Sequence, residues 1–120
     1  MKRLTPLCAA LCALALPALA PAQDMVQTAG KNAKVVLDNA DVRVIELNMP
    51  AGASTGMHEH KTDQLVVFLT GGTAKQTGAD GKTKEVTRKP GEVVWSEPVK
   101  HDTKNESGKP VRTLVIELKK

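Results

Sequence analysis

Aromatic residues are scarce in this chain. Its 120 residues include one phenylalanine, one tryptophan and no tyrosine. Proteins that bind bases or sugars by stacking use several aromatic side chains, so the sequence lacks such a platform. The basic residues are scattered along the chain, and the formal net charge is only +4. Together these features argue against nucleic acid as a partner.

Residues 1–22 have the three parts of a secretory signal peptide. Lys2 and Arg3 form a positive start, residues 4–19 form an apolar run, and small residues follow up to Ala22. This pattern predicts cleavage after Ala22 and export to the periplasm or out of the cell. The apolar run is short and interrupted by proline, so we expect no stable membrane anchor after cleavage.

Cysteine would be missing from the mature chain. Both cysteines, Cys8 and Cys12, lie in the predicted signal peptide, whose removal leaves 98 of the 120 residues. Exported proteins commonly use disulfides for stability, but this chain must rely on core packing and on any metal that it binds. The loss of Lys2 and Arg3 also lowers the formal net charge to +2.

A sustained helical period is also absent after the signal peptide. Short apolar runs with a period near two recur instead, for example at 41–49, 65–69 and 92–96, with turn residues between them. This pattern predicts an all-β sandwich or small barrel. An α+β fold would need a helix of about ten residues or more, which the sequence does not offer.

The predicted mature chain is long enough for one domain. We expect residues 23–40 to form an N-terminal arm or edge strand, and residues 41–120 to form a single β-barrel domain. Within it, Asp80 and Gly81 lie between two alternating segments. Asp-Gly in this position is a strong signal for a β-hairpin.

All three histidines of the chain belong to one pattern. His58 and His60 are two residues apart, so in a strand both side chains point to the same face while Glu59 points away. Gln64 keeps this parity if the strand resumes after the intervening bend, whereas His101 must arrive from a distant strand. Three imidazoles on a β-scaffold predict a divalent transition metal site, but they do not select among Fe, Cu, Mn, Zn and Ni.

Two motifs around these histidines resemble the two motifs of the cupin superfamily. The first, G-x5-H-x-H-x3-E-x6-G, is matched by residues 52–71 except that Gln64 stands where the family has glutamate. The second motif is matched less closely. His101 and Asn105 keep its H-x3-N spacing, but the segment from Gly91 to the histidine is one residue short and lacks the motif glycine.

The resemblance extends over residues 42–118 and implies a double-stranded β-helix, which is a small jelly-roll barrel. It also implies one divalent metal ion held by four side chains where the motifs meet. Carried over to this chain, the implied metal ligands are His58, His60, Gln64 and His101. In the same comparison Asn105 is a loop or strand-capping residue.

Gln64 is the informative departure from the family pattern. A neutral glutamine oxygen leaves the full +2 charge of a divalent ion, so we expect weaker metal retention and a stronger attraction for anions. Gln64 is also too weakly basic to accept a proton. Asp63 and Glu59 cannot replace it, because their parity points them to the other face. The alternative is that Gln64 only donates and accepts hydrogen bonds in the pocket.

These features predict an exported cupin that binds or acts on a small anionic organic molecule. If it is an enzyme, dioxygenase chemistry with iron or copper is the first expectation, and isomerase or decarboxylase chemistry is the second. The activity class rests on the resemblance alone, because one fold hosts many activities. The alternative is a non-enzymatic domain that binds a small molecule or a metal.

Two alternatives to the metal site remain, and one further expectation concerns assembly. A relative that keeps the fold without metal, or a structural β-domain without a site, would also fit parts of the pattern. Exposed edge strands in small jelly rolls can pair, which makes a homodimer a further expectation.

Several other residues have ordinary structural explanations. Trp95 could line the pocket, but a single tryptophan in a valine-rich strand is expected in the core. Met49 and Met57 are expected to pack rather than to bind copper. Three basic residues are expected to be scattered surface charge rather than groups that steer an anion: Arg88, Lys89 and Lys100.

Overall fold

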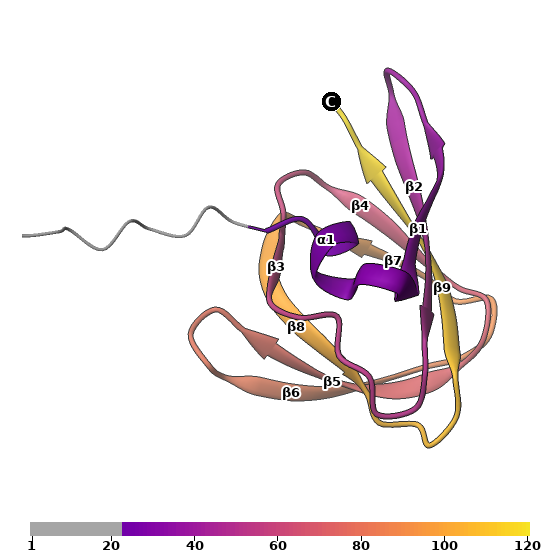
Figure 1. The fold of residues 1–120 in the computed structure, drawn as a ribbon, viewed down its shortest axis with the longest axis vertical. Helices are drawn as coiled ribbons and strands as arrows, with labels where there is room; N and C mark the ends of the chain where they lie inside the picture. Colours follow the sequence, from indigo (N-terminus) through magenta and orange to yellow (C-terminus); the bar gives the residue numbers. More distant parts are fainter. Residues whose placement is uncertain (1–22) are drawn as a thin grey trace, which may run out of the picture.

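The computed structural model describes residues 23–120, so the predicted signal peptide lies outside the described residues. Within them the chain forms two short helices followed by nine β-strands (Figure 1). The elements are α1 (Met25–Ala29), η1 (Gly30–Asn32), β1 (Ala33–Asp38), β2 (Val42–Met49), β3 (His58–His60), β4 (Gln64–Phe68), β5 (Gly72–Gly78), β6 (Thr83–Arg88), β7 (Val93–Ser96), β8 (Val99–Asn105) and β9 (Val111–Leu118). In this described part, neither helix has the length and apolar character needed to cross a membrane.

The nine strands form two antiparallel sheets. One has the order β1-β2-β9-β4-β7, and the other has the order β3-β8-β5-β6. The chain changes sheet between β2 and β3, between β3 and β4, and at four later connections, so the sheets are wound together around one interior (Figure 1). The predicted all-β class and double-stranded β-helix are confirmed.

Turns form where the sequence predicts them. The Asp80-Gly81 turn joins β5 to β6, and the Asp80 carboxylate accepts a hydrogen bond of 2.9 Å from the Lys82 amide. Two motif glycines, Gly52 and Gly91, have φ values of 77° and 81°. Glycine adopts this left-handed region without the steric cost that other residues meet, so both positions favour glycine for a conformational reason.

The N-terminal segment differs in part from the prediction. β1 lies at the edge of the five-stranded sheet, and α1, which was not predicted, precedes it. The Asp24 side chain caps this helix by accepting a hydrogen bond of 2.8 Å from the Val26 amide. Met25 and Ala29 are four residues apart, so they lie on one face and both are buried. A helix of one turn is too short to produce a visible period.

The packed core is small and lies along β2, β9 and α1. Its buried apolar members are Met25, Ala29, Ile45, Leu47, Met49 and Val115. Packing of Met49 is therefore confirmed, whereas Met57 is exposed. The expectation of a buried Trp95 is wrong, because its side chain is 54% exposed. It lies on β7, an edge strand of the five-stranded sheet, where one side has no neighbouring strand.

Candidate metal centre

The three histidines converge at one end of the interior. β3 supplies His58 and His60, which are buried on the same face, and β8 supplies His101. The antiparallel register of these strands places His101 directly opposite His58. One nitrogen from each ring can be chosen so that all three lie within 4.8 Å of one another. The short segment before His101 therefore still directs its imidazole inward.

A main-chain contact orients the His58 ring. Its Nδ1 lies 2.7 Å from the Gly56 carbonyl oxygen, which can only accept, so Nδ1 carries the proton. This leaves the lone pair of Nε2 facing His60, whose own Nε2 is 2.9 Å away. Two nitrogens that each bind one ion at about 2.1 Å are about 3 Å apart when the angle at the ion is near 90°. The pair therefore has the spacing of neighbouring metal ligands.

Gln64 reaches the interior from the other sheet. β3 ends at His60 and β4 begins at Gln64 in the other sheet. The two residues are therefore not on one continued strand, although the sequence argument assumed that they were. Gln64 is nevertheless buried and lines the same cavity as the histidines. Its Nε2 donates to the Ser96 hydroxyl over 3.4 Å. Its Oε1 is buried with no hydrogen-bond partner among residues 23–120.

The unpartnered Gln64 oxygen tests whether the site fits a cation. A buried acceptor without a partner costs about 1–3 kcal/mol. A cation beside the oxygen would offset this cost, and the imidazoles that line the same cavity are ligands that transition metals favour. The donor set present at this end of the cavity therefore fits a metal ion, and ligation by Gln64 stays a prediction.

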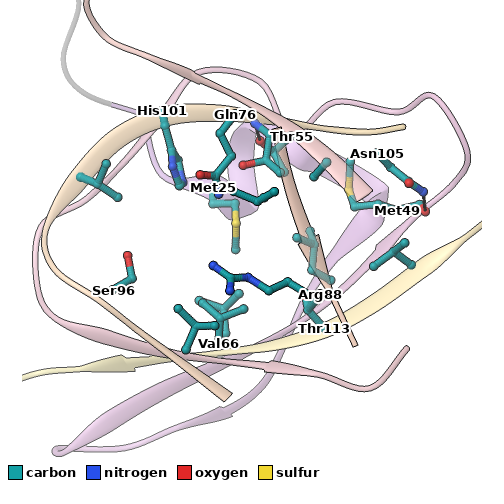
Figure 2. A pocket seen from close by; sticks show the side chains of 18 of the residues that line it. Met25, Met49, Thr55, Val66, Gln76, Arg88, Ser96, His101, Asn105 and Thr113 are labelled. Atoms are coloured by element: carbon teal, nitrogen blue, oxygen red, sulfur yellow. Dashed lines mark hydrogen bonds between the residues drawn. The ribbon is translucent and has the colours of Figure 1, made fainter. Parts of the chain in front are cut away.

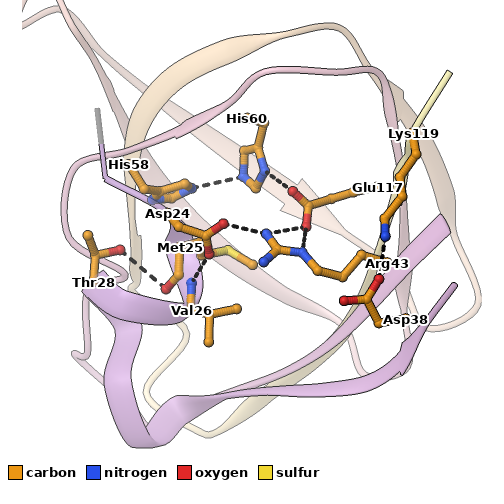
Figure 3. A network of polar contacts seen from close by, with 10 residues as sticks. All are labelled: Asp24, Met25, Val26, Thr28, Asp38, Arg43, His58, His60, Glu117 and Lys119. Carbon is orange, nitrogen blue, oxygen red and sulfur yellow. Dashed lines mark hydrogen bonds and ion pairs between the residues drawn. The ribbon is translucent and has the colours of Figure 1, made fainter. Parts of the chain in front are cut away.

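A carboxylate that the sequence did not single out lies behind His60. Glu117 of β9 places Oε2 at 3.7 Å from His60 Nδ1, which is outside hydrogen-bond range (Figure 3). Its Oε1 accepts a hydrogen bond of 2.7 Å from Arg43 Nε, and the same guanidinium contacts Asp24. The N-terminal cap of α1 is thereby connected to the histidine cluster through side chains of β2 and β9.

Charge attraction within this network shifts the pKa values of Glu117 and Arg43. Burial raises the pKa of Glu117, but His60 and Arg43 outweigh that effect and hold the pKa below its ordinary value. The bond to Glu117 in turn raises the pKa of Arg43. An ionised carboxylate beside the far nitrogen of a ligand histidine orients the ring and increases its basicity. The signal for this role is the register Arg43↔Glu117↔Gln64, which only strand pairing reveals.

Asn105 has the capping role expected of it. It is buried at the end of β8, and its Nδ2 donates to the carbonyl oxygens of Met49, Pro50 and Lys109 at 3.0, 3.2 and 2.7 Å. Its Oδ1 accepts from the Ser107 amide at 2.9 Å. One amide side chain thus joins the loops at the end of the barrel opposite to the histidines.

Comparison with known proteins agrees with this geometry. Residues 45–117 match the family model of the cupin domain. The chain belongs to the cupin family. A cupin domain from Bordetella pertussis Tohama I has 30% identity and a TM-score of 0.69, over 73% of this chain and 92% of that one.

More distant cupin structures share the fold. A cupin superfamily protein from Desulfitobacterium hafniense has 19% identity and a TM-score of 0.56, over 72% of this chain and 74% of its own. A cupin with a double-stranded β-helix fold from Methanocaldococcus jannaschii has 16% identity and a TM-score of 0.60, over 72% and 77%. No protein of curated function matches the chain.

Burial favours the neutral form of two histidines of this cupin. Loss of hydration lowers the pKa of His58, and the nearby His60 lowers it further. Burial is also the main cause that lowers the pKa of His101 to about 4, with smaller contributions from His58, His60 and Lys84. Neutral imidazoles are the form that binds metals.

Acid is expected to destabilise the metal-free cupin. The unfolded chain takes up protons near the ordinary histidine pKa of 6.5, whereas the folded His101 does so only near 4. Its stabilising contribution is therefore fully present above about pH 6.5 and is lost as the pH falls to about 4. At about 1.4 kcal/mol per pKa unit, we expect His101 to account for roughly 3–4 kcal/mol. Urea unfolding between pH 7 and pH 4 measures the loss, and His101→Gln should reduce it. Equal pH profiles of the two proteins would contradict this account.

Proposed function

We propose that this cupin binds one divalent transition metal ion, either Fe, Cu, Mn, Zn or Ni. The proposed ligands are His58, His60, His101 and Gln64. The observation that carries the proposal is the convergence of three imidazoles within 4.8 Å, together with the buried, unpartnered Gln64 oxygen. When bound, such an ion supplies Lewis acidity and a coordination position open to a small molecule.

We propose further that the protein is exported and that a small anionic organic molecule enters the cavity. All four proposed ligands are neutral, so the ion would keep its full positive charge and attract an anion. Glu117 would hold His60 in place from behind, and Gly56 would hold His58. Dioxygenase chemistry with iron or copper is the first activity to test, followed by isomerase and decarboxylase chemistry.

Non-enzymatic binding is the second candidate function. Among the described residues that line the cavity there is no aspartate or glutamate. A general acid or base would therefore have to come from the histidines or from the ligand itself. Oxygen consumption with a panel of small acids and phenols separates an oxygenase from a binding protein.

Metal analysis tests the proposal directly. The protein should be exported with its own signal and purified without chelators and without a histidine tag, and we expect close to one equivalent of a transition metal. Added metal should also raise the melting temperature of the metal-free form. Less than about a tenth of an equivalent of every transition metal, together with no thermal shift, would contradict the proposal.

Restoring the family's carboxylate should tighten metal binding. In Gln64→Glu a charged oxygen replaces a neutral one at the proposed ligand position, and we expect affinity to rise about tenfold or more. Competition with a chelator measures the change. Gln76→Glu is the matched control, because Gln76 lines the same cavity from β5. An equal rise in both variants would show that the effect is general charge attraction and that Gln64 is not a ligand.

A further inference from the structure

The cavity beyond the metal centre is basic at its walls. Its volume is about 570 Å³, and in addition to the three histidines its lining includes three cationic side chains, Lys82, Lys84 and Arg88. No carboxylate belongs to that lining within residues 23–120. A low-dielectric cavity lined by charge of one sign attracts ions of the opposite sign.

Arg88 is the cation that reaches into the interior. It ends β6, whose side chains alternate, so Arg88 faces inward together with Val86. Figure 2 shows its guanidinium extending into the open space that His101 and Ser96 also border. The expectation that Arg88 is scattered surface charge is therefore wrong, whereas Lys89 and Lys100 are exposed, as expected.

The contacts around Arg88 keep its hydrogen-bond donors available. Its cross-strand partner on β5 is Gly72, and Ser107 and Val111 fill the space that a side chain at Gly72 would take. Glu92 approaches Arg88 Nη1 with Oε2 at 3.7 Å, which is outside hydrogen-bond range. This contact therefore attracts the guanidinium electrostatically without using its N–H groups.

Apolar walls separate the two polar ends of the cavity. On β5, Gly78 pairs with His101 and Gly72 pairs with Arg88, so the two levels are six residues apart. Six residues of extended strand span about 20 Å, part of which the arginine side chain covers. The walls between the two levels include Leu47, Val66, Phe68, Val86 and Val115.

We propose that Arg88 binds the carboxylate of an organic acid with an apolar body. A guanidinium holds a carboxylate through two parallel hydrogen bonds, and the apolar walls would contact the rest of the molecule. The far end of the acid would then face the histidines. Only that last statement rests on the proposed metal centre, since the Arg88 end of the cavity is formed without any of the proposed ligands.

Octanoate and its neutral amide, octanamide, are suitable probes. Isothermal titration calorimetry measures the binding of each probe directly. In metal-free protein at low salt, we expect octanoate to bind more tightly than octanamide. Arg88→Gln should weaken octanoate binding about tenfold or more, because a charge-assisted pair is lost, and should leave octanamide binding unchanged.

Two further variants complete the test. Arg112→Gln removes an exposed guanidinium that pairs with Glu46 on the outer surface, and it should bind octanoate like the wild type. Arg88→Lys keeps the charge but not the two-pronged geometry, and it should lie between wild type and Arg88→Gln. It also serves as the test variant if Arg88→Gln does not fold.

The inference fails under either of two outcomes. One is wild-type octanoate affinity in Arg88→Gln, or in Arg88→Lys if the glutamine variant does not fold. The other is the absence of octanoate binding to the wild type at about 10 mM, equivalent to a binding free energy weaker than about 3 kcal/mol. A protein that purifies without metal but binds octanoate through Arg88 would contradict the proposed metal centre alone. If the protein binds metal but its octanoate affinity does not change when Arg88 is replaced, only this inference is contradicted.

Discussion

Replacing both His58 and His60 by alanine is expected to abolish metal binding. The double variant removes two of three imidazoles that converge within 4.8 Å, so we expect metal affinity to fall at least about a thousandfold. Elemental analysis of the purified protein and chelator competition measure the loss. The variant should still fold, because these side chains are not members of the apolar core along β2, β9 and α1.

Glu59→Gln is the matched control for this experiment. Glu59 lies between the two histidines on β3 but borders a separate outer pocket with Arg43 and Glu117. Its replacement should leave metal content unchanged and should show that altering β3 does not by itself disturb the site. Wild-type metal content in the double histidine variant would instead favour a structural β-domain without a metal centre.

Asn105→Ala is expected to cause the largest loss of stability. The change removes the donors that bind the carbonyl oxygens of Met49, Pro50 and Lys109, and it leaves these acceptors without that partner. Each buried group left unpaired costs about 1–3 kcal/mol, so we expect about 3 kcal/mol in total. For a domain of this size the melting temperature should fall by more than about 10 °C. Urea and thermal unfolding give both values.

An exposed asparagine provides the comparison. Asn48 of β2 bonds to Glu46 and Arg112 through its side chain at 3.2 and 3.0 Å, but these contacts lie at the surface. Asn48→Ala should therefore change the unfolding free energy by no more than about 0.5 kcal/mol. Similar losses in the two variants would show that the buried network around Asn105 does not hold the loops together.

Local patterns in the sequence were sufficient for much of the fold and part of the site. Alternation with a period of two predicts strands, and Asp80-Gly81 predicts the hairpin between β5 and β6. The same period places His58 and His60 on one face, because residues two apart in a strand point the same way. These predictions succeed since they depend on a few neighbouring residues and on backbone geometry alone.

Strand pairing and packing decided the remaining features. Alternation indicates that a strand has two faces, but it does not show whether a face meets a core, a cavity or solvent. Trp95 is exposed because β7 became an edge strand, and Arg88 lies inside because β6 turns that face toward the cavity.

The histidine site shows the same division. Sequence alone established that His58 and His60 share a face, since that depends only on spacing within one strand. Tertiary structure placed the predicted Gln64 on the opposite sheet, where it lines the same cavity, and brought Glu117 behind His60. These contacts join residues far apart in the chain, and they exist only once β4, β9 and β3 have taken their places. The electrostatic environment of the candidate metal centre is therefore a property of the assembled barrel.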